Sequence, residues 1–118
     1  MRLVNIRIFQ IDPECEHGAE KLFLSLANLE KHFGKKVDLE IYEEVWSGVV
    51  DSQTLEDVYM VFNTDLRPDD CRGRSMSVSD IVEVQLNDCT NLYYCDSIGW
   101  KMINHNTMWY DEQSSLLR

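Results

Sequence analysis

The chain has 118 residues, enough for one domain around a single core, and its composition of 44% hydrophobic and 27% charged residues is typical of a globular protein. No apolar run approaches the ~18 residues of a membrane-spanning helix, and the N-terminus alternates where a secretory signal would be continuously apolar. We therefore expect a cytoplasmic protein with one domain over residues 1–103 and a C-terminal tail over residues 104–118.

Negative charge is concentrated in the middle of the chain, whose formal net charge is −10. Residues 36–70 hold two basic and ten acidic side chains, whereas the two kinds balance over residues 1–35. Such a segment repels nucleic acid and anionic membranes and attracts basic protein surfaces. We expect no direct binding to nucleic acid or membrane. Two interpretations of the segment stay open, a solubilising face and a recognition patch.

The cysteines and histidines predict neither a metal site nor a cofactor. They are spread along the chain: Cys15, Cys71, Cys89 and Cys95, with His17, His32 and His105. No cysteine pair has C-x-x-C spacing, and cytosolic thiols stay reduced, so we expect reduced packing residues, although Cys89 and Cys95 are spaced to face each other across a hairpin. The histidines are expected on the surface or at helix ends.

The first half of the chain alternates between strand and helix periodicity. Residues 3–11 have apolar side chains on both faces, which predicts a strand inside a sheet. Apolar residues then recur at helical spacing over 18–33, and Gly34 follows as a C-cap, so we expect one amphipathic helix packed on the sheet. Alternation from Val37 to Val45 predicts a second strand, and residues 47–51 are expected to turn the chain.

The second half predicts a helix followed by three strands. Ser52 or Thr54 can cap the helix, because acidic residues occupy its first turn. The expected buried stripe of this helix consists of Leu55, Val58, Tyr59 and Phe62. After a loop over residues 63–73, we expect antiparallel strands at 81–86 and 92–97 and a short strand at 100–103. The predicted fold is a single α+β domain with two helices on a mixed, largely antiparallel sheet of about five strands.

Residues 73–80, GRSMSVSD, place serines at alternate positions before an aspartate that precedes a strand. A serine nucleophile needs a base within hydrogen-bond reach, and the nearest histidine in sequence is His105. A phosphate-binding loop would need a lysine and a following helix. We therefore favour a structural role for the segment over a protein-binding edge or a catalytic site.

In this structural interpretation, serine and aspartate oxygens accept backbone N–H bonds and form a compact loop from Ser77 to Asp80. Asp80 is then the clamp of the loop. Arg74 is expected to pair with Asp80 or Asp96, which would place two motif segments side by side. The residues assigned to this structural motif are Arg74, Ser75, Ser77, Ser79, Asp80, Asp96 and Gly99.

Two stretches share a pattern with a known family: TLEDVYMVFNTDLRPDDCRGRSMSVSDIVEV, residues 54–84, and YYCDSIGW, residues 93–100. They resemble the YodL-like domain family of bacterial and phage proteins. The family pattern is an LED-type helix ending in FN, a P-x-D loop, a G-R-S-L-S-V-S-D run and a Y-x-D-S-x-G segment followed by an aromatic residue. The matching residues are Leu55, Glu56, Asp57, Phe62, Asn63, Asp65, Pro68, Asp70, Gly73, Arg74, Ser75, Ser77, Val78, Ser79, Asp80, Tyr94, Asp96, Ser97 and Gly99. Met76 and Trp100 replace a leucine and a phenylalanine, and Cys71 lengthens the loop.

The resemblance covers about residues 20–103 and is weaker before Asp51. It implies the predicted fold and a setting on phages, conjugative elements and their hosts. It supplies no catalytic mechanism.

These observations support three hypotheses about function. The first is a small acidic, non-catalytic module of a phage or mobile element that binds the basic surface of a protein partner and inhibits a host defence nuclease, as an anti-CRISPR or anti-restriction protein, by imitating nucleic acid. The second is an adaptor or regulatory module that binds a host housekeeping protein through exposed aromatics such as Trp46, Trp100 and Trp109. The third is a hydrolase using Ser75 or Ser77 with Asp80.

The first hypothesis assigns partner binding to eight carboxylates: Glu40, Glu43, Glu44, Asp51, Glu56, Asp57, Asp69 and Asp70. The oligomeric state is open, and four apolar residues of the tail suit contact with a second copy: Trp109, Tyr110, Leu116 and Leu117.

Overall fold

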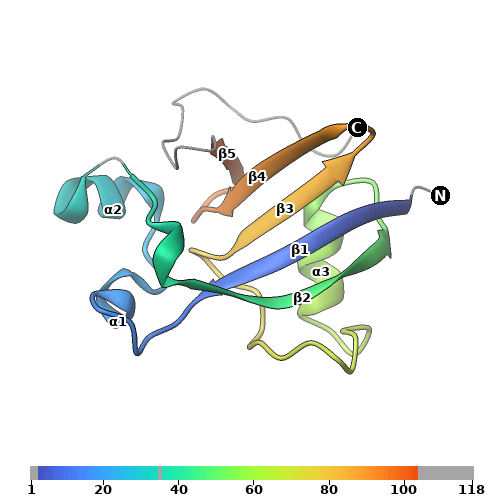
Figure 1. Ribbon diagram of the computed structural model, residues 1–118, viewed down its shortest axis with the longest axis horizontal. Helices are drawn as coiled ribbons and strands as arrows, with labels where there is room; N and C mark the ends of the chain where they lie inside the picture. Colours follow the sequence, from blue (N-terminus) through green and yellow to red (C-terminus); the bar gives the residue numbers. More distant parts are fainter. Residues whose placement is uncertain (1–2, 35, 104–118) are drawn as a thin grey trace.

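The computed structural model describes residues 3–34 and 36–103, which form one domain around a five-stranded sheet of order β2-β1-β3-β4-β5 (Figure 1). The strands are β1 (Leu3–Ile11), β2 (Tyr42–Asp51), β3 (Ile81–Leu86), β4 (Cys89–Cys95) and β5 (Trp100–Ile103). Every neighbouring pair is antiparallel, so the expectation of a mixed sheet is wrong. The segment between β1 and β2 returns the chain alongside β1 in the opposite direction, without the crossover that a parallel pair requires.

Four helical segments accompany the sheet: α1 (Gly18–Lys21), α2 (Leu26–Phe33), the 3₁₀ helix η1 (Leu39–Ile41) and α3 (Leu55–Phe62). The prediction of a single helix over residues 18–33 is therefore wrong. Phe23 takes a left-handed conformation, with φ of 69°. Ser25 then starts α2 as its N-cap by accepting the Asn28 N–H. Gly34 is the C-cap of α2, as expected.

Two hydrogen bonds from distant parts of the chain hold the break between α1 and α2. The Phe23 N–H donates to Ser79 Oγ at 3.0 Å, and the Tyr94 hydroxyl donates to the Leu24 carbonyl at 2.7 Å. Tertiary bonds thus replace helical ones here. This explains why helical spacing alone predicted a continuous helix.

β2 differs from its prediction at both ends. Residues 39–41 form η1, and the strand runs on through residues 47–51, which were expected to turn. Its partner β1 is long enough to pair with it to the end, Leu3 with Asp51. A register shift between Ile8 and Phe9 accommodates the irregularity opposite Val45.

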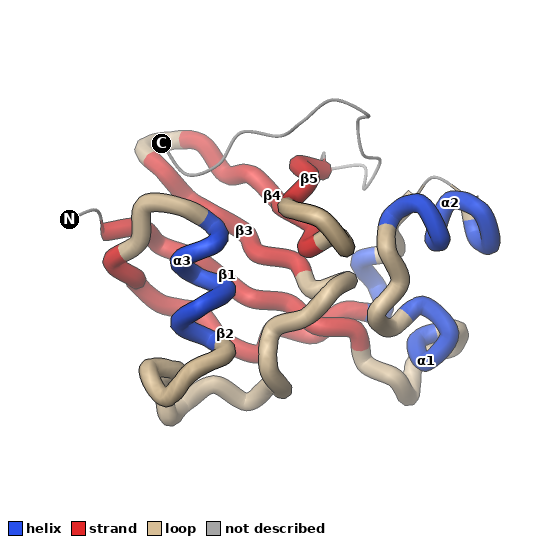
Figure 2. The backbone as a smooth tube through the Cα atoms, turned by 180° about the vertical axis from the view of Figure 1, so that it is seen from behind, coloured by secondary structure: helices blue, strands red, loops and turns tan. Residues whose placement is uncertain are grey.

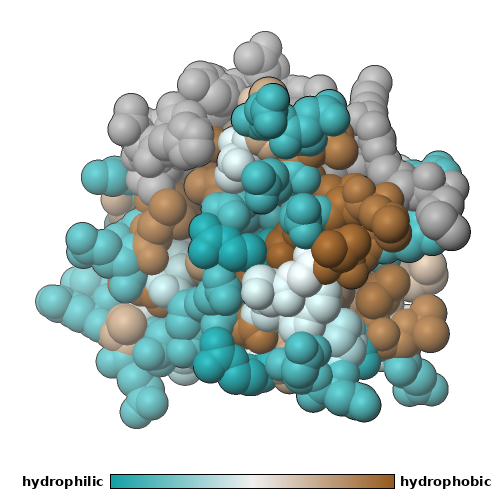
Figure 3. All heavy atoms as spheres, turned by 45° about the vertical axis from the view of Figure 1, so that its right-hand side comes forward, coloured by the Kyte–Doolittle hydropathy of each residue, from teal (hydrophilic) through white to brown (hydrophobic). Residues whose placement is uncertain are grey.

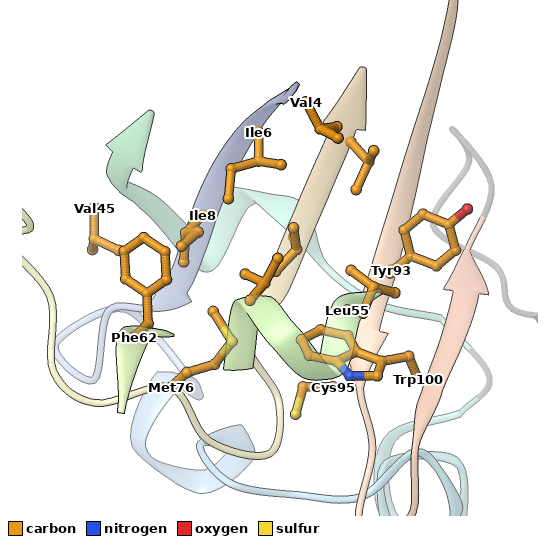
Figure 4. Close-up of a cluster of buried hydrophobic side chains, with 13 residues drawn as sticks. Val4, Ile6, Ile8, Val45, Leu55, Phe62, Met76, Tyr93, Cys95 and Trp100 are labelled. Carbon is orange, nitrogen blue, oxygen red and sulfur yellow. The ribbon is translucent and has the colours of Figure 1, made fainter. Parts of the chain in front are cut away.

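β1 lies inside the sheet, between β2 and β3, as its two apolar faces predicted. One face of the sheet and α3 share a buried core (Figures 2 and 4). This core consists of Val4, Ile6, Ile8, Val45, Leu55, Val58, Phe62, Met76, Val82, Val84, Tyr93, Cys95 and Trp100. A second cluster consists of Leu26, Leu29, Val37, Ile81, Leu92, Tyr94 and Ile103.

α3 buries Leu55, Val58 and Phe62, whereas Tyr59, expected in the same stripe, is 38% exposed. Of the two candidate caps, Thr54 forms a capping box with Asp57. None of the described helices is long and apolar enough to cross a membrane.

The described cysteines are all free thiols. Cys89 pairs in the sheet with Leu86, and Cys95 pairs with Trp100, so the two cysteines share one strand and do not face each other. Within the described residues, no group of three His, Cys, Asp or Glu side chains could hold a metal ion. The expectations on the tail and on His105 lie outside these residues.

Candidate functional site

The GRSMSVSD segment forms a polar cluster with β1, in which Gln10 and Asp80 are buried and Arg74 and Ser77 are half-buried. Gln10 Nε2 donates to Asp80 Oδ2 and to the Arg74 carbonyl, both at 2.9 Å, and Gln10 Oε1 accepts the Arg74 N–H at 3.0 Å. The Ser77 N–H donates to Asp80 Oδ2 at 3.0 Å. Asp80 therefore clamps the loop and also attaches it to β1.

Gln10 is a member of this cluster that the sequence interpretation missed. It is 2% exposed and follows Val4, Ile6 and Ile8 on the inward face of β1. A polar residue in phase with buried apolar ones must find hydrogen-bond partners in the interior. The position of Gln10 in the alternating pattern of β1 was the sequence feature that could have identified it.

Burial raises the pKa of the Asp80 carboxyl from 3.8 to about 7, against the opposing effects of its hydrogen bonds from Ser77 and Gln10 and of the charge on Arg74. Asp80 Oδ1 has no hydrogen-bond partner among the described residues. Near neutral pH the protonated and ionised forms are thus close in free energy.

Arg74 does not pair with Asp80 or Asp96, contrary to expectation: the ion pairs within 4 Å in the described part of the chain involve Arg7 and His17. Its guanidinium instead donates to the Ile11 carbonyl at 3.0 Å and lies 5.7 Å from the Phe23 ring centroid.

The Asp96 carboxylate is used by the backbone. Asp96 Oδ1 accepts the N–H groups of Leu26 and Ser97 at 3.0 and 2.8 Å. The Asp96 N–H donates to the Gly99 carbonyl at 3.0 Å, and Gly99 has φ of 71°, which favours glycine. Asp96 and Gly99 thus fix the turn between β4 and β5 and attach it to the start of α2.

Ser79 connects the same segment to further elements. It is fully buried with φ of 86°, its N–H donates to the Cys95 carbonyl, and its carbonyl accepts the Tyr42 hydroxyl at 2.6 Å. Ser77 Oγ has no hydrogen-bond partner in the described residues, and Ser75 is exposed. The geometry ties the segment into the fold.

Four exposed carboxylates lie around one edge of the sheet. Glu40 belongs to η1 and Glu43 to β2, while Asp69 and Asp70 belong to a loop that runs beside β2. The Arg72 N–H donates to the Val45 carbonyl at 3.0 Å, and Trp46 Nε1 donates to Asp70 Oδ1 at 2.8 Å, so the loop is attached to the strand. We call these four residues the acidic edge.

The other four carboxylates of the predicted set lie elsewhere or have structural partners. Glu44 pairs with Arg7 at 3.1 Å, and Arg7 also binds Glu83 at 2.7 Å. Asp57 belongs to the capping box of α3, and Asp51 ends β2 opposite Leu3. Glu56 lines a cavity beside the turn between β4 and β5. The eight residues therefore do not form one surface.

The aromatic residues of the adaptor hypothesis are placed differently from its expectation. Trp100 is 1% exposed and lies beside Cys95 in the core (Figure 4), so the prediction that it is an exposed anchor is wrong. Trp46 is half-buried, and its ring packs edge-on against Phe62 at 5.1 Å between centroids. Trp109 lies outside the described residues.

A comparison with known proteins identifies the family. The model of the YodL-like domain family matches residues 5–105, which adds most of β1 and the start of α1 to residues 20–103, over which the sequence resembles the family. No curated protein and no solved structure matches the chain. Because the match spans most of the 118 residues, the chain belongs to the YodL-like domain family.

Proposed function

We propose that the chain is a non-catalytic protein-binding module of a phage or mobile element, acting in the cytoplasm, whose acidic edge occupies a basic surface of a host defence nuclease. The observation that carries this proposal is the grouping of Glu40, Glu43, Asp69 and Asp70 around β2. Carboxylates held on a strand and its attached loop present fixed negative charge, which can imitate a phosphate backbone.

Among the eight predicted carboxylates, the ion pairs separate Glu43 and Asp69 from Glu44. Within the described residues, Glu43 and Asp69 have no ion-pair partner within 4 Å, whereas Arg7 neutralises Glu44. Unneutralised carboxylates contribute most to long-range attraction of a basic partner. Glu43 and Asp69 are therefore the residues to change.

The test is the association rate of the purified chain with a panel of CRISPR effectors and restriction nucleases, measured at low and high salt. The rate with the matching nuclease should fall markedly as ionic strength rises, because the Debye length falls from about 10 Å at 0.1 M to about 3 Å at 1 M. Glu43→Lys with Asp69→Lys should slow association more at low salt than at high salt.

The matched control is Glu30→Lys with Asp88→Lys, which makes the same change in net charge at exposed positions in α2 and in the turn between β3 and β4. This control should retain most of the low-salt rate. Equal slowing by both pairs would mean that only net charge matters, and the acidic edge would then be a solubilising face.

An adaptor that binds a host housekeeping protein is the second candidate, favoured by exposed apolar side chains other than the tryptophans. Ile98 is 87% exposed, Met60 55% and Tyr59 38%. Figure 3 shows a face on which hydrophobic side chains reach the surface between hydrophilic ones. Apolar contacts predict binding that salt weakens little, so the same salt series separates the two candidates.

A further inference from the structure

A cavity of about 160 Å³ lies between the start of α3 and the turn that joins β4 to β5. Glu56, Asp96 and Ser97 contribute its polar lining, and Tyr59 and Trp100 contribute aromatic walls. The cavity is well below the roughly 300 Å³ at which drug-sized or cofactor sites begin. Its size suits the end of one side chain.

The cavity is negatively charged. Within the described residues, no ion pair within 4 Å neutralises Glu56 or Asp96. Both carboxylates act on the Cys95 thiol, which also lines the cavity: burial, with smaller contributions from the charges of Asp80, Glu56 and Asp96, raises the pKa of this thiol to about 12. The thiol is therefore unreactive, and a cation is the complementary occupant.

An apolar rim accompanies this negative cavity. Ile98 is 87% exposed and lies between Ser97 and Gly99, both of which line the cavity. The turn that carries Ile98 is held by the hydrogen bonds of Asp96, so the side chain is presented to solvent on a fixed backbone. Tyr59, 38% exposed, reaches the same cavity from α3.

We propose that this cavity binds an arginine side chain of a protein partner. The planar guanidinium offers a fork of donors to the carboxylates of Glu56 and Asp96 and stacks on an aromatic face such as Tyr59, which a lysine ammonium does less well. Apolar residues beside that arginine pack on Ile98. The site adjoins β4 and β5, whereas the acidic edge adjoins β2 at the other edge of the sheet, so it extends the proposed function with a separate contact.

The test is a titration of the ¹⁵N-labelled full chain with N-acetyl-arginine amide, followed by two-dimensional NMR of the backbone amides. Saturable shifts are expected at Ser97, Ile98 and Gly99. N-acetyl-citrulline amide, which has nearly the same shape without the charge, should cause none, and N-acetyl-lysine amide should bind more weakly. Glu56→Gln should weaken arginine binding about fivefold, as expected for an exposed ion pair, while Asp88→Asn, at an exposed position at the opposite end of β4, leaves it unchanged.

Three results would overturn the proposal: no saturable shifts with the arginine probe, equal shifts with citrulline, or unchanged binding by a Glu56→Gln variant that unfolds at the wild-type temperature. Lysine binding as tight as arginine binding would reject the assignment to arginine. The two proposals can fail separately, because the nuclease test changes Glu43 and Asp69 and the titration probes the cavity at Glu56. If arginine does not bind the cavity, salt-dependent association with the nuclease is still expected. If the acidic edge does not bind a nuclease, binding of the arginine probe is still expected.

Discussion

Raising the pH from about 4 to about 8 should lower the free energy of unfolding by a few kcal/mol more in the wild type than in Asp80→Asn. Burial raises the pKa of Asp80 from 3.8 to about 7, so between these values the folded chain keeps a proton that the unfolded chain has released. The stabilisation that this proton gives the folded state is fully present below the pKa of Asp80 in the unfolded chain. It is lost as the pH rises to the pKa of Asp80 in the folded chain. Urea denaturation across this range measures it.

Asp80→Asn isolates this effect from the other carboxylates, because its amide oxygen can accept the same hydrogen bonds from Gln10 and Ser77 without titrating. The difference between the two proteins should therefore change mainly over the pH window between about 4 and about 7. If the free energy of unfolding changed with pH equally in the two proteins, the pKa of Asp80 would not be raised by folding. A wild type that gains on the variant as the pH rises would mean that Arg74 stabilises the ionised carboxylate more than burial disfavours it.

Trp100→Ala should lower the free energy of unfolding by roughly 3–5 kcal/mol, the usual loss for a buried aromatic residue replaced by alanine. Trp100 is 1% exposed, and it contributes to the same core as Leu55 and Cys95 (Figure 4). Its removal leaves a cavity between α3 and the end of the sheet. Urea denaturation at low and at high salt should give a similar loss, because packing depends little on ionic screening.

Ile98→Ala is the control for this prediction, because Ile98 is two residues away and 87% exposed. Its free energy of unfolding should stay within about 0.5 kcal/mol of the wild type. A similar loss in both variants would show that the loss at Trp100 does not arise from burial in the core.

Local patterns predicted β1, β3 and α3, whereas the bounds of other elements depend on distant partners. The apolar side chains on both faces of residues 3–11 identified an interior strand, and the pattern of residues 81–86 identified β3 with its bounds. The strand expected over residues 92–97 instead runs over Cys89–Cys95. The break at Phe23 depends on Ser79, 56 residues away, so no local periodicity indicates it. The continuation of β2 through Gly48 depends on the length of β1, which overrides a local turn signal.

Local sequence also predicted some features of the candidate sites and not others. The structural role of Asp80 followed from residue chemistry, because an aspartate after serines commonly closes a loop. The sequence did not predict that the eight carboxylates have different roles, because these roles depend on distant contacts and local geometry. Glu44 pairs with Arg7 across the sheet, and Asp57 forms the capping box of α3. The cavity at Glu56 joins α3 to a turn about 40 residues later, a juxtaposition that only the fold creates.

Phage plating on bacteria that carry an active CRISPR or restriction nuclease tests the central claim most directly. Expression of the wild-type chain should raise the plating efficiency toward that of a nuclease-free host. Glu43→Lys with Asp69→Lys should abolish this protection, while the control pair Glu30→Lys with Asp88→Lys retains it at equal protein level. Plating that the wild-type chain leaves unchanged across the nuclease panel, or protection that survives reversal of the acidic edge, would contradict the account.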